Sequence, residues 1–401
     1  MKTREVKLGE VANVKGGKRI PKGIGLINIP NGHPYIRVRD LNNKRLLELD
    51  NSYEYVDNET QKVISKYTVK TGDVVLSIVG TIGLVAIVGR TLDGANLTEN
   101  CVKLSSFHGV NRDFLYYYLR SDCGQQEIRC GTVGAVQAKL PIKNIQNIAI
   151  NLPDYTTQER IASLLLSIDR KIELNQKIND NLEQQAAALF ESWFVNYDPW
   201  DGVQPSEWEN APLGSFVEIK RGGSPRPIQD FLSDSGLRWL KISDVTSLSS
   251  PFVLEIKEHI KEEGLRKTVF LHAGELVLSN SATPGIPKIL DVDTCIHDGW
   301  LYFPKSELSK YYLYLFFKHI RKELVALGNG SVFTNLKTDI LKAFPATKAD
   351  EATLKEFDAL VTPLFDAMLN ADRENFKLAA MRDALLPKLM SSEIDVSEVE
   401  L

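Results

Sequence analysis

Two stretches of the chain carry mostly apolar residues at a regular helical spacing. From Thr157 onward the positions step by four and three residues without a break, and they are Ile161, Leu165, Ile168, Ile172, Asn175, Asn179, Leu182, Ala186, Leu189 and Trp193. A second set near the end of the chain repeats the spacing, with Phe357, Val361, Leu364, Met368, Ala371, Asn375, Leu378, Arg382, Leu385 and Leu389. Such a repeat is typical of a coiled coil. The two seams therefore predict two long helices that pack against each other.

Three residues within these seams qualify the prediction. Asn175 and Asn375 lie in the middle, where a polar side chain costs stability but penalises wrong registers; a solvated edge is the alternative interpretation. Pro363 interrupts the second seam, so that helix is either kinked there or begins there with Thr362 as its cap. The sequence leaves both alternatives open.

The remaining segments contain short apolar runs between glycines. Val74–Ser77 and Leu276–Leu278 are bounded by Gly-Asp or Gly-Glu and by later glycines, which predicts strands and turns. The longest nonpolar stretch, Leu76–Gly89, is shorter than the roughly 18 residues that a membrane-spanning helix needs and contains three glycines. We therefore predict a buried hairpin there and no membrane partner.

The pattern occurs twice, at a distance of about 200 residues, which indicates a duplicated unit. Six matches keep the same order in both copies: Leu8-Gly9 with Leu213-Gly214, Lys15–Lys18 with Lys220–Gly223, Tyr35–Asp40 with Trp239–Asp244, Lys70–Ser77 with His272–Ser279, Phe114–Leu119 with Tyr311–Phe317, and the turns Gly131–Gly134 with Gly328–Ser331. Each copy then reaches a proline, Pro153 or Pro345, and a helical segment.

These patterns predict an α+β fold. Two mixed α/β domains, 1–153 and 201–349, alternate with two helical regions, 154–200 and 350–401. A helix from Thr156 to Phe194 would be roughly 58 Å long, which exceeds one turn of DNA, about 34 Å. Paired with each other, the two helices would act as a ruler between the domains.

The net charge of −4 is unevenly distributed. Residues 1–153 contain 21 Lys and Arg against 14 Asp and Glu, whereas residues 201–349 contain 18 of each. The helical regions are acidic, with 4 basic against 8 acidic residues in 154–200 and 5 against 12 in 350–401. The first domain is therefore suited to phosphate, and the acidic helices to protein or solvent.

Several classes of protein are excluded by missing motifs. The sequence has no phosphate-binding loop of ATPases, no Asn-Pro-Pro-aromatic tetrapeptide of amino-methyltransferases, and no glycine turn placed between a strand and a helix for a nucleotide. Four cysteines and six histidines show no metal-ligand spacing. The first residues do not have the pattern of a signal peptide. We expect a cytoplasmic protein that is not an enzyme and holds no metal or cofactor.

Two segments resemble a known family. Thr157-Gln158-Glu159-Arg160-Ile161-Ala162 after Leu152-Pro153, and the closing Met381–Ile394, are similar to specificity subunits (HsdS) of Type I restriction-modification systems, and the resemblance covers essentially the whole chain. One departure is that 344–350 lacks the Gln-Glu-Arg-Ile of the first copy, which leaves the start of the second helix open.

The resemblance implies a function and a set of partners. It implies two target recognition domains that each read half of a split site in double-stranded DNA, joined by an antiparallel coiled coil. It also implies two methyltransferase subunits that use S-adenosylmethionine to methylate adenine, and motor-nuclease restriction subunits that use ATP and Mg. DNA methylation and cleavage would then belong to these partners.

Candidate DNA contacts follow from residue type and position. Lysine and arginine on glycine-rich loops neutralise phosphates, and backbone approaches most easily at Gly16, Gly17, Gly222 and Gly223. The loop residues are Lys15, Lys18, Arg19 and Lys22 in the first copy and Lys220, Arg221 and Arg226 in the second. A solvated basic loop is the alternative interpretation.

Further candidates are suited to reading base edges. Arg37 and Arg39 alternate with apolar residues, which predicts a strand with both side chains on one face; Lys241 is a less regular counterpart, and a surface ion pair is the alternative role. After the glycine turns, Gln and Asn would read adenine and Lys would contact phosphate, unless these residues only cap turns. They are Gln137, Lys139, Asn335 and Lys337. The aromatic residues Tyr116–Tyr118 and Tyr311–Phe317 are expected in the core.

A coiled-coil adaptor that gathers proteins without touching DNA is the alternative function. The two hypotheses differ in one respect, because phosphate contacts require an affinity for DNA that falls steeply with salt.

The hypothesis that each domain reads its own half-site independently, here called modular reading, can be tested by exchanging residues 1–153 for the corresponding domain of another family member. We expect one half of the methylated target to change and the other to stay, because each domain reads its own half-site. The readout is the methylated motif made by the assembled complex. A change in both halves would rule out modular reading.

Overall fold

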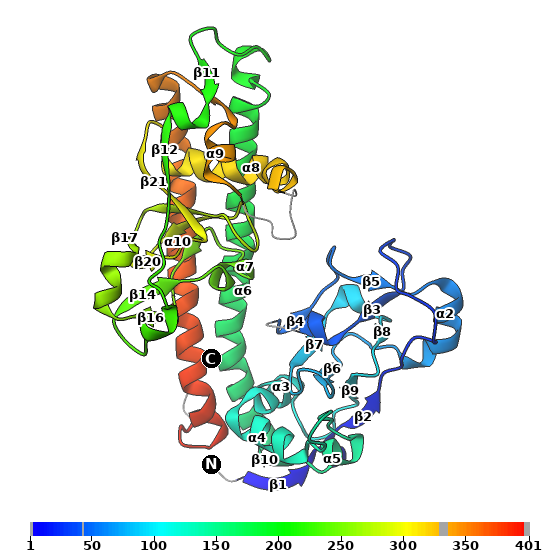
Figure 1. The fold of residues 1–401 in the computed structure, drawn as a ribbon. Helices are drawn as coiled ribbons and strands as arrows, with labels where there is room; N and C mark the ends of the chain where they lie inside the picture. Colours follow the sequence, from blue (N-terminus) through cyan, green and yellow to red (C-terminus); the bar gives the residue numbers. More distant parts are fainter. Residues whose placement is uncertain (1–2, 42–43, 329–335, 397–401) are drawn as a thin grey trace. The chain divides into compact units, whose positions relative to one another are not determined.

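The computed structural model describes residues 3–41, 44–328 and 336–396 (Figure 1). The chain divides into two compact units: Met1–Arg170 with Leu378–Leu401, and Lys171–Lys377. Each unit contains one strand-rich head and a part of each long helix. The two helical regions that the sequence predicts as separate segments are thus shared between the units. No helix in the described part of the chain is both long and apolar enough to cross a membrane.

The head of unit 1 is built on two small sheets. The larger has the strand order β2 (Asn13–Gly16), β9 (Cys101–Ser105), β6 (Val74–Ser77), β7 (Val85–Val88) and β4 (Leu46–Leu47). The smaller has the order β5 (Glu54–Tyr55), β3 (Pro34–Ile36) and β8 (Asn96–Leu97), and β1 (Thr3–Lys7) pairs with β10 (Ala149–Pro153). The antiparallel β6–β7 pair confirms the predicted hairpin.

The head of unit 2 repeats the larger sheet strand for strand, and among the described residues its second sheet has five strands where that of unit 1 has three. Its first sheet runs β12 (Val217–Arg221), β21 (Trp300–Ser306), β18 (Leu276–Ser279), β19 (Pro287–Leu290) and β15 (Phe252–Val253). The second runs β13 (Leu232–Ser233), β16 (His259–Ile260), β14 (Leu237–Leu240), β20 (Thr294–Ile296) and β17 (Val269–Leu271), while β11 (Glu209–Pro212) pairs with β22 (Pro345–Lys348). In each head the last strand of the larger sheet pairs parallel to its neighbour, β4 with β7 and β15 with β19.

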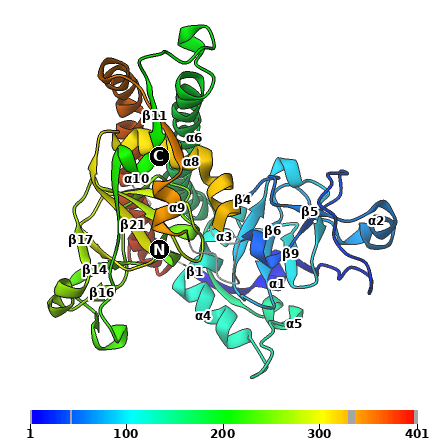
Figure 2. The same cartoon turned by 45° about the horizontal axis from the view of Figure 1, so that its top comes forward.

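Helices complete both heads. Unit 1 has α1 (Leu8–Val11), α2 (Asn58–Ile64), α3 (Arg112–Arg120), α4 (Asp122–Gly131) and α5 (Ile142–Gln146), and unit 2 has α7 (Ser243–Thr246), α8 (Lys310–Gly328) and α9 (Thr338–Lys342). In unit 1 the sheet of β3, β5 and β8 lies with α2 at the end opposite α3 and α4 (Figures 1 and 2). The short 3-10 helices are Val38–Leu41, Ser65–Tyr67, Arg90–Leu92, Asp198–Trp200, Leu213–Ser215, Ile228–Asp230 and Glu262–Lys267.

Equivalent hydrogen bonds show that the sequence repeat is a structural repeat. In the hairpin turns, Ser77 Oγ donates to Thr81 O and Ser279 Oγ donates to Thr283 O, both at 2.6 Å. Leu8 N donates to Ile148 O at 2.9 Å, and Leu213 N donates to Phe344 O at 2.8 Å. The ordered matches in the sequence therefore mark positions with the same backbone contacts.

The two long helices are α6 (Tyr155–Phe194) and α10 (Glu351–Met390), and they pair antiparallel. In unit 2, Asn175 Nδ2 donates to Asn375 Oδ1 at 2.9 Å, and Asn179 Nδ2 donates to Asp372 Oδ1 at 2.8 Å. Asn175 is only 2% exposed. A buried side-chain amide that can be hydrogen-bonded in only one register of the two helices favours a role of Asn175 in fixing that register, rather than a position at the solvated edge of the helix pair.

The helix α10 begins twelve residues before Pro363, so it does not begin at Thr362. Its N-cap is Asp350, which accepts from Thr353 N at 3.0 Å and from Thr353 Oγ1 at 2.6 Å. Asp154 caps α6 through Thr157 with the same two bonds, at 3.0 and 2.7 Å. Pro363 leaves one backbone bond of the helix unmade. The buried neighbours Val361 and Phe365 stabilise the helix across this point.

A buried carboxylate of α6 ties the head of unit 1 to the helices. Tyr117 of α3 donates to Asp169 Oδ2 at 2.5 Å, and Arg382 of α10 donates to Asp169 Oδ1 at 2.8 Å. The side chains of Asp169 and Arg382 are 6% and 17% exposed. Burial and the neighbouring carboxylate raise the pKa of Tyr117 far above its usual value, so the phenol stays a hydrogen-bond donor.

Unit 2 has a related contact, made by a residue further along the same helix α6. Tyr314 and Lys318 of α8 donate to Glu183 Oε1 at 2.5 and 2.7 Å. The predicted aromatic clusters are core residues in both heads: Tyr116, Tyr117 and Tyr118 are at most 4% exposed, and Tyr311–Phe317 are at most 9% exposed. Each head therefore packs its aromatic helix on α6 and anchors it by a phenol–carboxylate bond.

Replacing Arg382 by methionine should destabilise unit 1 by about 3 kcal/mol, because Asp169 would remain buried without its cation. Hydrogen exchange of α3 peptides should accelerate accordingly. The fluorescence of the five tryptophans, which all lie between Trp193 and Trp300, reports on unit 2 and should not change.

Arg373→Met is the matched control on the same helix. Arg373 pairs with Asp291 at 2.6 Å, but its side chain is 51% exposed, so we expect a loss below about 1 kcal/mol. Equal effects of the two variants would contradict the anchoring role of Asp169.

Candidate nucleic-acid interface

Lys15 lies within β2, so its prediction as a loop residue is wrong, whereas Lys18, Arg19 and Lys22 lie in the loop that follows β2. Lys15, Lys18, Arg19 and Lys22 all lie on the surface. Arg19 pairs with Glu99 at 3.3 Å with 81% of its side chain exposed, and the Lys18 ammonium lies 5.5 Å from the ring centroid of Tyr67. These partners leave the cations close to solvent, where they would remain available to phosphate.

The glycines of both basic loops have an internal structural role. A Cβ at Gly17 would lie 2.1 Å from Thr98 O, and a Cβ at Gly222 would lie 2.3 Å from His297 O. Gly17 N donates to Cys101 O at 3.0 Å, and Gly222 N donates to Trp300 O at 2.9 Å. The glycines thus let the loop backbone pack against the neighbouring strand end. This gives a reason for these glycines that does not involve DNA.

In unit 2, Lys220 and Arg221 lie at the end of β12 rather than in the predicted loop, and both Arg221 and the loop residue Arg226 contact Asp298. Arg226 Nη2 lies 3.1 Å from Asp298 Oδ2, Ser224 Oγ donates to Asp298 Oδ1 at 2.7 Å, and Arg221 donates to the Asp298 carbonyl. Burial alone would raise the pKa of Asp298, but the Ser224 bond and the two guanidinium charges outweigh it and lower that pKa. Lys220 pairs with Glu218 at 2.8 Å. The loop is basic but already partly neutralised.

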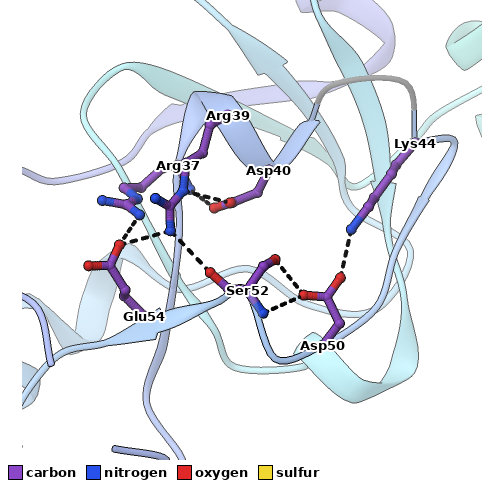
Figure 3. A network of polar contacts seen from close by, with 7 residues as sticks. All are labelled: Arg37, Arg39, Asp40, Lys44, Asp50, Ser52 and Glu54. Atoms are coloured by element: carbon purple, nitrogen blue, oxygen red, sulfur yellow. Dashed lines mark hydrogen bonds and ion pairs between the residues drawn. The ribbon is translucent and has the colours of Figure 1, made fainter. Parts of the chain in front are cut away.

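Arg37 and Arg39 do not lie in a strand, so that prediction is wrong. The strand β3 ends at Ile36, and residues 38–41 form a 3-10 helix, because Asp40 accepts from Arg37 N at 2.7 Å and turns the chain. Both guanidinium groups nevertheless reach the same carboxylate, Glu54, with Arg39 Nη2 at 2.8 Å (Figure 3). Burial raises the pKa of Asp40 to about 6, and the charge of Arg39 acts against the rise.

Lys241 is the structural counterpart of Arg37. Lys241 N donates to Asp244 Oδ2 at 2.9 Å, as Arg37 N does to Asp40, and the Lys241 ammonium pairs with Glu258. Glu258 is likewise the counterpart of Glu54. Glu54 lies opposite Tyr35 in the strand pair β3–β5, and the backbone carbonyl of Glu258 accepts a hydrogen bond from the N–H of Trp239, which is the counterpart of Tyr35. The ion pair is therefore present in both heads, although the cation differs.

The ion pair of unit 2, Lys241 with Glu258, lines a hollow of about 930 Å³. The walls combine charged, aromatic and small polar side chains from five segments, including Arg226, Trp239, Lys241, Glu258, Ser281 and His297. His297 Nδ1 accepts from Gly299 N at 2.8 Å, so the neutral ring carries its proton on Nε2. Burial lowers the pKa of His297, which favours this neutral form.

The candidates after the glycine turns are only partly described. In unit 1, residues 133–139 form an exposed loop closed by two bonds between Val133 and Lys139, each 2.9 Å, and both Gln137 and Lys139 are exposed. In unit 2, Asn335 lies outside the described residues, and Lys337 is the exposed N-cap residue of α9. Lys337 corresponds to Pro141, which precedes α5.

Sequence reasoning missed the acidic partners of the cations. Glu54 lies seventeen residues after Arg37, and Glu258 lies seventeen after Lys241. That equal separation was a signal in the sequence. Without the strand pairing, however, nothing connected these glutamates with the arginine and lysine.

Comparison with known proteins identifies the family. A family model described as the Type I restriction modification DNA specificity domain matches residues 2–184 and 205–347. The MjaIX specificity subunit of Methanocaldococcus jannaschii is 24% identical over 385 residues, which are 91% of this chain and 88% of that protein. The HindI specificity subunit of Haemophilus influenzae is 24% identical over 341 residues, with 67% and 73% covered.

A solved structure supports the same fold. The crystal structure of a Type I restriction-modification S subunit from M. genitalium is similar with a TM-score of 0.59, at 14% identity and with 96% of each chain covered. The family model matches both halves of the repeat and most of the sequence. The chain therefore belongs to the family of Type I restriction modification DNA specificity domains.

Proposed function

We propose that this chain is the non-catalytic DNA-recognition subunit of a Type I restriction-modification complex, with one half of a split, asymmetric target read by each head. The observation that carries the proposal is a duplicated frame with different exposed cations at equivalent places. Arg37 with Arg39 in unit 1 corresponds to Lys241 in unit 2, and both are presented by the same strand, turn and glutamate. Two heads built alike but charged differently are suited to two different sequences.

Catalysis is assigned to partner subunits in this proposal. Two methyltransferase subunits would bind S-adenosylmethionine and modify adenine, and restriction subunits would use ATP and Mg. This chain would hold no cofactor and would contribute only base and phosphate contacts. The adaptor hypothesis does not account for the basic excess of residues 1–153.

The helix α6 offers a docking surface for a methyltransferase subunit. Leu174 and Ile178 are one helical turn apart, so they lie on one face, and they are 53% and 43% exposed. Neighbouring Lys171 and Glu374 form an ion pair at 3.2 Å. An apolar pair bordered by charge is suited to a protein partner.

DNA binding can be tested through its dependence on salt. The affinity of the full chain for duplex DNA should fall linearly in a log–log plot against salt concentration. Replacing Lys18 and Lys22 by alanine should reduce the steepness by about 2, because each lost phosphate contact removes about one unit. The measurement is fluorescence anisotropy on duplexes of several sequences.

The matched control removes the same charge from α2 and the 3-10 helix that follows it in the same head. Lys62→Ala with Lys66→Ala should leave the slope unchanged. A wild-type affinity that does not depend on salt would favour the adaptor, and an equal effect of the two double variants would contradict a specific role for the basic loop.

Docking can be tested by placing charge on the proposed surface. Leu174→Glu with Ile178→Glu should weaken association with the methyltransferase subunits at least about 10-fold, because two carboxylates would lose water at the interface. Analytical ultracentrifugation of the mixed subunits measures this. Val63→Glu, at a position 65% exposed on α2, is the control and should have no effect. Normal assembly of the double variant would exclude this surface.

A further inference from the structure

The duplicated ion pair has a geometry that the fold alone does not require. In both heads a cation follows the central strand of the second sheet, β3 or β14, and an aspartate three residues later fixes its backbone. A glutamate at the start of the neighbouring strand β5, or directly before the neighbouring strand β16, receives its side chain. The side chains of Arg37 and Glu54 are 28% and 24% exposed, and those of Lys241 and Glu258 are 40% and 39% exposed. Both pairs are thus open to an approaching molecule.

Stability is a weak explanation for keeping these pairs. Ion pairs with this exposure contribute about 0–1 kcal/mol. Arg37 Nε is buried and has no hydrogen-bond partner among the described residues, which costs stability. The aspartate bonds already fix the backbone turn, so the glutamates are not needed for it. A role outside folding is therefore favoured.

The surroundings of the second pair indicate what it could meet. Lys241 and Glu258 border the hollow of about 930 Å³, together with Trp239 and the neutral His297. Within this space a donor (Lys241), an acceptor (Glu258) and flat rings lie side by side. This combination matches the edge of a base pair, which presents acceptors and amino donors within one plane.

We propose that Glu54 and Glu258 are base-reading residues, each accepting a hydrogen bond from an exocyclic amino group in the major groove beside a guanine read by the paired cation. Cytosine N4 is the amino group that carboxylates accept from most commonly, and arginine or lysine donates to guanine O6 and N7. The inference rests on the proposed function. In the free protein each pair keeps its two groups side by side before DNA arrives.

The two heads would read with different stringency. Arg37 and Arg39 both converge on Glu54, and a guanidinium can make two parallel bonds to guanine. Lys241 presents a single ammonium, which acts as a point charge with less directional preference. The first half-site should therefore discriminate guanine more strongly at its position than the second.

The test is selection from randomised duplexes by the full chain assembled with its methyltransferase subunits. Glu54→Gln should lower base discrimination about 5-fold to 100-fold at one or two positions of the first half-site, since a single mismatched base pair in a recognition site changes affinity by roughly that much. Glu258→Gln should do the same in the second half-site only. Because no phosphate contact is lost, neither variant should change the salt dependence of affinity.

Matched controls separate reading from folding. Glu59→Gln, whose partner is Lys62, and Glu307→Gln, whose partner is Lys348, remove an exposed glutamate from each head and should leave both half-sites unchanged. Unchanged base preference in the Glu54 and Glu258 variants, with a wild type that selects a split motif, would overturn the inference and leave the pairs as structural. A wild type that selects no motif would instead contradict the proposed function.

Discussion

The hydrogen-bonded carboxylates of α6, of which Asp169 is buried and Glu183 half-buried, are the interaction on which the rest of the structure depends. Asp169 and Glu183 each receive a phenol from an aromatic helix, at 2.5 Å in both cases, and each also receives a cation. A buried carboxylate is costly unless it is fully bonded, so each head has few alternative ways to pack on the helix. The strands of each head are in turn packed with that aromatic helix, and the exposed basic loops extend from those strands.

Duplication explains why one frame can serve two different reading surfaces. The strand order, the glycines that pack at 17 and 222, and the serine-closed hairpin turns recur in both heads. The exposed cations on this frame differ, with Arg37 and Arg39 in one head and Lys241 in the other. Packing constrains the interior residues, whereas the surface loops can vary at little cost to stability. Such a division is what recognition of two unlike half-sites requires.

Much of the fold could be predicted because it follows from periodic patterns. The seams predicted α6 to within one residue at its start, and the ordered repeat predicted two heads of one design. The strand predicted for Arg37 and Arg39 was wrong because a single bond from Asp40 turns the chain, which a two-residue alternation cannot reveal. The start of α10 stayed open in the sequence because Asp350 caps it without the Gln-Glu-Arg-Ile of the first copy. Glu54 and Glu258 were missed because their partners are close in space only through strand pairing.

The central claim is that this chain directs a complex to one DNA sequence. The most direct measurement is a genome-wide map of methylated adenine in the host, with and without the gene. The account predicts that methylation at one split, asymmetric motif disappears with the gene and returns when the gene is restored. A map that carries such a motif and keeps it fully methylated without the gene would contradict the claim.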